Sequence, residues 1–301
     1  MTQELRDLVA AELAEPVDPR VGQMAEALAA RYPGAARAVL FYGSCLRGGA
    51  VEGQMLDFYL IVSDYRSAYG RSWMAPANRL IPPNVFPFQH NGLTAKYAVL
   101  SVEDFHRLNG SDTSSVSVWA RFAQPSRLVW SDDDRAAAEC SAAISQAAPT
   151  LLSAAWPMLE EESPDPLQLW REAFALTYSA ELRAERGGRA ASVVGEDRDR
   201  YLRFTAPALE AAGLNPWKRP SPAQRRSAVR QWAKKRRTGK ILSVLRLAKA
   251  SGTYAGGIDY LAWKINRHAG TKISIAPWQR RWPLLAAITL LPQLLKQRAI
   301  R

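Results

Sequence analysis

Two apolar runs joined by a glycine-rich segment limit what the first part of this chain can fold into. The run at residues 38–42 ends in Gly43-Ser44, and a second run follows at Met55–Val62. Short apolar runs bounded by turn residues are typical of buried strands. The second run contains one carboxylate, Asp57, and a lone acid among apolar neighbours is costly unless it is paired or bound to a metal. The sequence therefore predicts two strands with a buried acid close to the turn that follows the first.

The turn and the carboxylate together suit the binding of a triphosphate. Glycine at position 43 lets the backbone approach phosphate oxygens, which the Ser44 hydroxyl and nearby N–H groups can bind. Asp57 on the next strand can hold Mg²⁺, which stabilises charge during in-line attack at the α-phosphorus. This layout is similar to that of the nucleotidyltransferase superfamily, although the second acid usual there is replaced by Tyr59. The structural alternative is that Asp57 only pairs with a core arginine.

The spacing of apolar residues extends the fold along the chain. Helices are predicted at 5–13, 21–28 and 102–108, further strands at 96–101 and 126–130, and a long loop at 66–95. From Asp132 the spacing is helical, at 132–148, 167–186, 198–212, 222–250 and 253–268. We therefore expect the α+β class: a nucleotidyltransferase-like α/β head with a mixed sheet at 1–135, a helical middle domain at 136–216, and a basic, tryptophan-rich helical tail at 217–301.

Charge is divided unevenly along the chain. Residues 218–301 hold twenty Lys/Arg and one acid, so the net charge of +12 divides into +19 for this tail and −7 for residues 1–217. Such segregation is typical of a chain that binds a polyanion, either nucleic acid or anionic lipid. Trp278, Trp282 and the apolar residues 284–295, flanked by Arg and Lys, are typical of an interfacial membrane anchor. This favours lipid over nucleic acid, and the alternative is a terminal helix packed on the core.

Five short sequence blocks along the chain match, in the same order, the motifs of one known family. They are Phe41-Tyr-Gly-Ser44 with Met55-Leu-Asp-Phe58, Lys96-Tyr-Ala-Val-Leu-Ser101, Trp119-Ala-Arg-Phe-Ala-Gln-Pro125, Glu172 with Leu176-Thr-Tyr-Ser-Ala-Glu-Leu-Arg183, and Arg246 and Lys249 with Thr253-Tyr-Ala-Gly256. In this order they resemble the mitochondrial-type phosphatidate cytidylyltransferase, a soluble CDP-diacylglycerol synthase of the nucleotidyltransferase fold. That family also lacks the second acid. The resemblance covers roughly half of the chain and breaks down at residues 63–91 and 187–240.

The resemblance implies a function in phospholipid biosynthesis: transfer of a cytidylyl group from CTP to phosphatidic acid, giving CDP-diacylglycerol and pyrophosphate. In that reaction Asp57 would hold Mg²⁺, and Gly43 and Ser44 would cradle the triphosphate. Lys96, read as the start of a strand, would neutralise phosphate charge; the alternative is a solvated strand-end lysine. Arg246 and Lys249 would receive the lipid headgroup. Glu181 or Glu172 would supply the second group that binds the metal or organises the triphosphate. The alternative is that these acids only pair with arginines along their helix.

Several classes of protein do not fit the composition. Two cysteines, Cys45 and Cys140, are too few for a disulfide framework. The chain starts without the pattern of a secretory signal, and its longest apolar stretch, 282–295, is shorter than the roughly 20 residues of a spanning helix. We therefore expect a bacterial, cytoplasmic protein that is peripheral on the inner face of the membrane, with CTP, phosphatidic acid and anionic lipid as partners.

Two other functions are compatible with the same features. One is a nucleotidyltransferase that acts on another acceptor, such as an RNA end or a small alcohol. The other is a non-catalytic protein that binds membranes or nucleic acid through its basic tail and has a degenerate transferase head. The molecule that receives label from CTP distinguishes these possibilities.

Overall fold

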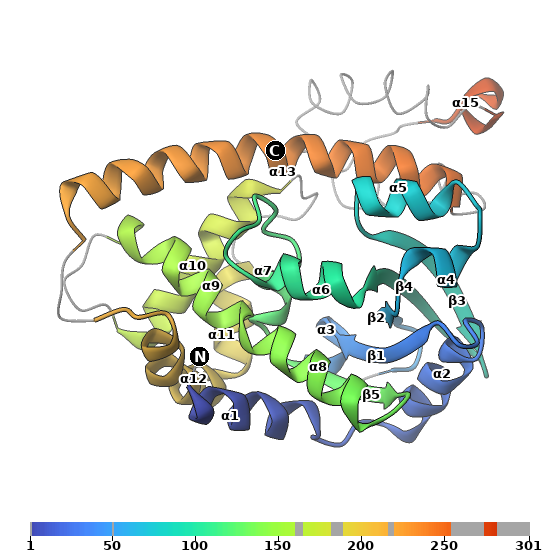
Figure 1. Cartoon of the computed structure of the whole chain (residues 1–301), viewed down its shortest axis with the longest axis horizontal. Helices are drawn as coiled ribbons and strands as arrows, with labels where there is room; N and C mark the ends of the chain where they lie inside the picture. Colours follow the sequence, from blue (N-terminus) through green and yellow to red (C-terminus); the bar gives the residue numbers. More distant parts are fainter. Residues whose placement is uncertain are drawn as a thin grey trace.

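The computed structural model of this chain describes residues 2–49, 51–159, 165–181, 189–215, 220–253 and 274–281. It is α+β, with a five-stranded sheet whose strands lie in the order β3-β4-β2-β1-β5 (Figure 1). The strands are β1 (Ala36–Tyr42), β2 (Met55–Val62), β3 (Asn84–His90), β4 (Leu93–Ser101) and β5 (Ser126–Ser131). β2 and β4 are parallel, and the other neighbouring pairs are antiparallel. The expected α+β class and mixed sheet are confirmed.

The long loop predicted at residues 66–95 is wrong. This segment contains α4 (Tyr65–Tyr69), α5 (Met74–Leu80), the whole of β3 and the start of β4. β3 lies at the edge of the sheet and contains Pro87, which is tolerated there because an edge strand does not need every N–H group for pairing. Because β4 begins at Leu93, Lys96 lies inside this strand and not at its start.

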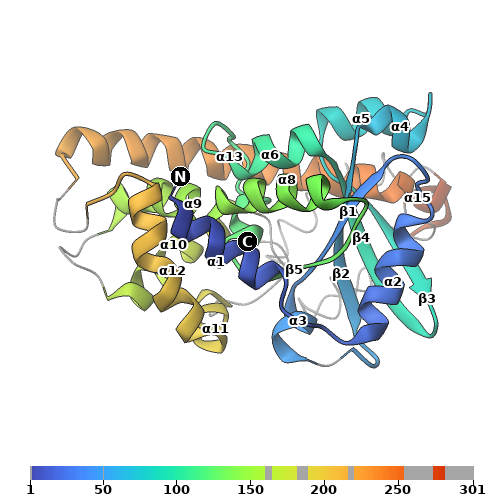
Figure 2. The same ribbon diagram turned by 60° about the horizontal axis from the view of Figure 1, so that its bottom comes forward.

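Alternate residues of the strands face two separate apolar clusters. Phe58, Leu60 and Val62 pack with α2 (Pro19–Ala29), whereas Tyr59 and Ile61 pack with the larger helical layer. Figure 2 shows α2 on one side of the sheet and α1 (Gln3–Leu13) and α8 (Asp134–Ser145) on the other. Since side chains alternate along a strand, Asp57 and Lys96 lie on the same face as Tyr59 and Ala98. Both charged residues therefore face the helical layer.

Helices form the rest of the described structure. Beyond those already named they are α3 (Ser44–Gly48), α6 (Val102–Asn109), α7 (Trp119–Phe122), α9 (Ala147–Ala155), α10 (Pro166–Ala180), α11 (Arg189–Glu196), α12 (Arg198–Ala211), α13 (Pro222–Thr253) and α15 (Pro277–Arg281), with a 3-10 turn at Trp156–Met158. The segment predicted as a single helix at 132–148 contains α8 and the start of α9. The helix predicted at 167–186 ends at Ala180, and the next residue, Glu181, has an extended backbone. No helix in these ranges is long and apolar enough to cross a bilayer.

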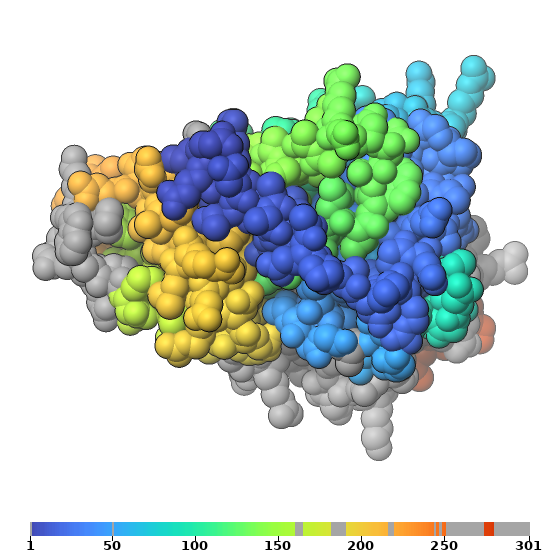
Figure 3. All heavy atoms as spheres, turned by 90° about the horizontal axis from the view of Figure 1, so that it is seen from below, coloured from blue at the N-terminus to red at the C-terminus, as the bar shows by residue number. Residues whose placement is uncertain are grey.

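A buried ion pair joins α1 and α12 in the helical layer. Figure 3 shows α1 crossing one face of the molecule between α12 and α8. Beneath it, Glu12 of α1 accepts two hydrogen bonds from the Arg200 guanidinium of α12, which also donates to the carbonyl oxygen of Ala123 at 2.9 Å. These two side chains are 7% and 3% exposed. Because Ala123 directly follows α7, this pair also fixes the position of α7.

The described part of the basic tail packs on the core through α13. Trp232 is buried, and its indole N–H donates to the carbonyl oxygen of Ala154 at 2.8 Å. Further along α13, the side chains of Arg246 and Lys249 reach the segment before β3. Most basic side chains of residues 225–240 remain exposed. The predicted helix at 253–268, beyond its first residue, and the apolar residues 284–295 lie outside the described ranges, and the domain boundaries at 135 and 216 stay predictions.

Candidate functional site

Gly43 directly follows β1 and has a conformation that only glycine adopts readily. Its φ is 97° and its ψ −162°, and Ser44 begins α3 directly after it. An ideal Cβ placed on Gly43 would lie 2.8 Å from Oδ2 of Asp57, so the carboxylate rests against the turn. The pairing of Tyr42 with Asp57 across β1 and β2 produces this contact. The turn and the acid thus form one local unit, as the sequence predicted.

The partner of Asp57 is a lysine and not a core arginine. The parallel register of β2 and β4 places Lys96 beside Asp57, and Nζ of Lys96 lies 3.0 Å from Oδ1 of Asp57. The Asp57 side chain is 16% exposed and the Lys96 side chain 33%. Lys96 is therefore neither a strand-end residue nor fully solvated, and its ammonium group offsets the cost of placing the acid between strands.

A cavity of about 340 Å³ opens in front of this ion pair. Its walls come from β1, β2, β3, β4, α7, the residue after α10, and α13. They include five of the predicted site residues: Asp57, Lys96, Glu181, Arg246 and Lys249. These residues are up to 192 positions apart in the sequence, between Asp57 and Lys249. The predicted phosphate-binding residues Gly43 and Ser44 are not part of the lining: Gly43 lies against Asp57, and Ser44 is exposed at the start of α3.

Glu181 reaches the cavity because α10 and α13 approach each other closely. A Cβ on Gly239 of α13 would overlap the carbonyl oxygen of Ala180, the last residue of α10. The backbone then becomes extended at Glu181, so this side chain does not follow the helical spacing from which its direction was predicted. Glu172 accepts a hydrogen bond from Gln168 at 2.9 Å within α10 and does not line the cavity. Arg183 lies outside the described residues.

Two cations of α13 lie at the cavity, Lys249 buried and Arg246 half-buried. Nζ of Lys249 donates to the Ile81 carbonyl oxygen and, at 3.4 Å, to Oδ1 of Asn78. Burial and then the charge of Arg246 lower the pKa of Lys249 to about 7. Burial also lowers the pKa of Arg246, whose Nε donates to the Pro82 carbonyl oxygen at 2.8 Å. Both side chains line the cavity, where Arg246 also interacts electrostatically with Glu181.

Arg121 of α7 is a site residue that the sequence analysis did not select. Its guanidinium lies 4.8 Å from the ring centroid of Tyr42, and its Nε has no hydrogen-bond partner in the part of the chain that the structure describes. Burial alone would lower the pKa of Arg121, but Tyr42, Tyr59 and the two cavity carboxylates raise it overall. The available signal was a basic residue inside the otherwise apolar stretch Trp119–Phe122, within one of the blocks that carried the resemblance.

The charges in the lining indicate which ligand the cavity suits. Among the described residues, the cations Lys96, Arg121, Arg246 and Lys249 outnumber the carboxylates Asp57 and Glu181. A polyanion such as a triphosphate would balance this excess. The two carboxylates also fit Mg²⁺, which is usually held by one or two carboxylates together with water and phosphate oxygens. The described part of the chain has no cluster of three or more potential His, Cys, Asp or Glu ligands.

No protein-family model matches the sequence, and no curated protein is significantly similar to it. The geometry of the cavity therefore carries the functional argument. It defines an α+β protein with a cationic cavity, two carboxylates and a glycine turn that one of these acids contacts.

Proposed function

We propose that this protein is a Mg²⁺-dependent cytidylyltransferase that converts CTP and phosphatidic acid to CDP-diacylglycerol and pyrophosphate, with a head of the nucleotidyltransferase type. The observation that carries the proposal is the contact between Asp57 and Gly43 at the edge of a cavity rich in cations. Nucleotidyl transfer is supported by this geometry. The choice of CTP and of a lipid acceptor rests on the resemblance of the sequence blocks.

The proposed reaction is a single displacement. An oxygen of the lipid phosphate forms a bond to the α-phosphorus of CTP, the bond from that phosphorus to the β-phosphate oxygen breaks, and pyrophosphate leaves with the electron pair. The attacking oxygen already carries negative charge, so no side chain has to remove a proton. Catalysis then depends on the position of the two phosphates and on stabilisation of the charge that they share.

The chain supplies these two requirements with residues from separate elements. Asp57 and Glu181 would hold Mg²⁺, which when bound supplies charge neutralisation on the phosphate oxygens. Lys96 and Arg121 lie on the sheet side of the cavity and would bind the triphosphate. Arg246 and Lys249 on α13 would bind the acceptor phosphate. Arg121, Arg246 and Lys249 are held in place by neighbouring groups before substrate binds, whereas Lys96 and Asp57 would exchange their mutual contact for the triphosphate and Mg²⁺.

Labelled CTP, Mg²⁺ and vesicles that contain phosphatidic acid test the proposal. We expect lipid-soluble label with the wild-type chain, and loss of that label in Asp57→Asn. The control is Asp134→Asn, which removes an exposed carboxylate on α8 and should leave transfer unchanged. Label that appears only in RNA or in a small alcohol supports the second transferase function. Absence of label in every acceptor supports a non-catalytic binding protein and contradicts the proposal.

A further inference from the structure

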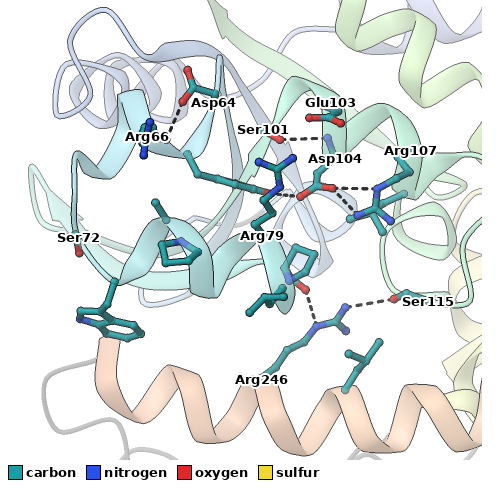
Figure 4. A pocket seen from close by; sticks show the side chains of 18 of the residues that line it. Asp64, Arg66, Ser72, Arg79, Ser101, Glu103, Asp104, Arg107, Ser115 and Arg246 are labelled. Carbon is teal, nitrogen blue, oxygen red and sulfur yellow. Dashed lines mark hydrogen bonds and ion pairs between the residues drawn. The ribbon is translucent and has the colours of Figure 1, made fainter.

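A second and larger hollow lies beside the cavity. This cleft, of about 1380 Å³, is lined by α4, α5, α6 and α13 together with the segment around Ser115 (Figure 4). The cleft could not be expected from the sequence. Two of the helices that line it, α4 and α5, lie in the segment that the sequence pattern indicated to be a loop.

The cleft lining contains five arginines, Arg66, Arg71, Arg79, Arg107 and Arg246, and three acids, Asp64, Glu103 and Asp104. Arg66 lies close enough to Asp64 to interact electrostatically with that carboxylate. Among the described side chains, Arg71 and Arg79 form no ion pair. By contrast, Arg107 is neutralised by Asp104, which also accepts a hydrogen bond from the Tyr65 hydroxyl at 2.6 Å. Figure 4 shows Arg79 and Arg246 among the side chains that line the cleft, together with the ion pair of Asp104 and Arg107. The α4–α5 side of the cleft thus offers several positive charges to an anion.

Two large apolar side chains stand exposed on the same side. Trp73, which directly precedes α5, is 54% exposed, and Leu80, the last residue of α5, is 78% exposed. They are seven positions apart, so two turns of helix place them on one face of α5. Both line the cleft. Exposed tryptophan and leucine next to arginines are typical of segments that lie in the interface of a membrane.

Arg246 connects the cleft with the smaller cavity. It lines both hollows. Its guanidinium bridges the Pro82 carbonyl oxygen, at 2.8 Å, and the Ser115 hydroxyl, at 3.2 Å. The Ser115 hydroxyl lies 3.0 Å from that of Ser117, which lines the cavity. Arg246 therefore lies at the border between the cleft and the cavity that holds Asp57.

We propose that the cleft is the entrance for an acidic phospholipid presented by a membrane. Trp73 and Leu80 enter the bilayer interface, the arginines of α4 and α5 bind the anionic headgroup, and Arg246 holds the headgroup phosphate at the border of the cavity. The chemistry on this side fits an amphipathic anion because exposed apolar and cationic side chains occur together. That this lipid is also the acceptor of the reaction rests on the proposed function.

Binding of the full chain to sedimented vesicles tests the cleft directly. The vesicles contain phosphatidylcholine with or without phosphatidic acid. We expect Arg71→Gln combined with Arg79→Gln to weaken binding to the acidic vesicles roughly 10- to 30-fold. Trp73→Ser combined with Leu80→Ser should weaken binding to a similar extent.

Matched controls lie on α12, far from the cleft in Figures 1 and 2. Arg198→Gln with Arg203→Gln removes two exposed arginines, and Leu202→Ser removes an apolar side chain that is 47% exposed. These variants should bind acidic vesicles as the wild type does. If cleft and control variants bind equally well, or if the cleft arginines bind RNA and not vesicles, the inference is wrong.

Kinetics separate this inference from the proposed function. The cleft variants should raise the KM for phosphatidic acid in vesicles roughly tenfold and leave the affinity for CTP unchanged, because the cleft does not include Asp57 or Lys96. If the cleft variants lose vesicle binding and the wild-type chain transfers no label, the membrane site is supported and the proposed transferase is contradicted. Unchanged vesicle binding and KM in an active enzyme would contradict the cleft and leave the transferase intact.

Discussion

Replacement of Gly43 by alanine tests whether the turn and the Asp57 carboxylate work as one unit. The new Cβ would lie 2.8 Å from Oδ2 and 3.3 Å from Cβ of Asp57. Both separations are shorter than the roughly 3.5–4.0 Å at which non-bonded carbon atoms attract each other best. The backbone also has φ of 97° and ψ of −162°, a region that is essentially restricted to glycine. Alanine must therefore twist the turn or push the carboxylate away.

The expected size of the effect follows from these two costs. Backbone strain of this kind costs about 1–3 kcal/mol, and the free energy of unfolding should fall by at least that amount. A displacement of about 1 Å at a catalytic group can reduce a rate roughly 100-fold, so we expect a loss of that order in cytidylyl transfer. Urea unfolding followed by far-UV circular dichroism measures the first quantity, and transfer of label from CTP measures the second.

Gly49 provides the matched control. Its φ is 69°, but a Cβ there would meet no atom of the described residues within 4 Å. Gly49→Ala should therefore lose about 1–2 kcal/mol of stability from the left-handed backbone alone and retain its transfer rate. If Gly43→Ala is as active as Gly49→Ala, the position of Asp57 does not depend on the turn and the reasoning is refuted.

Three other perturbations address two residues of the cavity and the buried ion pair between α1 and α12. The pKa of Lys249 is lowered to about 7, so its amine is charged below that pH and neutral above it. The KM for the phosphate substrates should therefore rise as pH increases through about 7. In Lys249→Arg the side chain stays charged, so this dependence of KM on pH should flatten. Arg121→Gln should lower kcat roughly 10²–10³-fold by removing a cation that is already in place, while a thermal melt checks that the fold persists. Glu12→Gln leaves the Arg200 guanidinium buried without its acid and should reduce the free energy of unfolding by about 3–5 kcal/mol in urea, whereas Glu12→Leu combined with Arg200→Met should cost much less.

The sequence predicted the parts of the site that depend on local pattern. Apolar runs placed β1, β2, β4 and β5, and the lone acid in β2 together with the preceding glycine identified the contact between Asp57 and Gly43. These features were readable because a buried strand needs a continuous apolar run and because a buried acid needs a partner. The order of the sequence blocks then indicated Glu181, Arg246 and Lys249, which the fold brings to the same cavity.

Other parts of the site depend on tertiary contacts that no local pattern records. β3 alternates poorly between buried and exposed residues and contains Pro87, so its pattern resembles a loop although β4 pairs with it. Glu181 turns into the cavity where α10 stops against Gly239 of α13. Arg121 has the sequence context of a helix residue, and only the fold shows that its guanidinium lies over the Tyr42 ring. The cleft beside α5 was not expected for the same reason, because α4 and α5 lie in the segment at 66–95 whose pattern resembles a loop.

Equilibrium binding of labelled CTP, with and without Mg²⁺, tests the central claim most directly. If Asp57 and the turn at Gly43 form a site for a metal-bound triphosphate, wild-type protein and Asp134→Asn should bind CTP in a Mg²⁺-dependent manner, and Asp57→Asn should lose that dependence together with most of its affinity. Equal, Mg²⁺-independent binding by the wild type and Asp57→Asn would contradict the account.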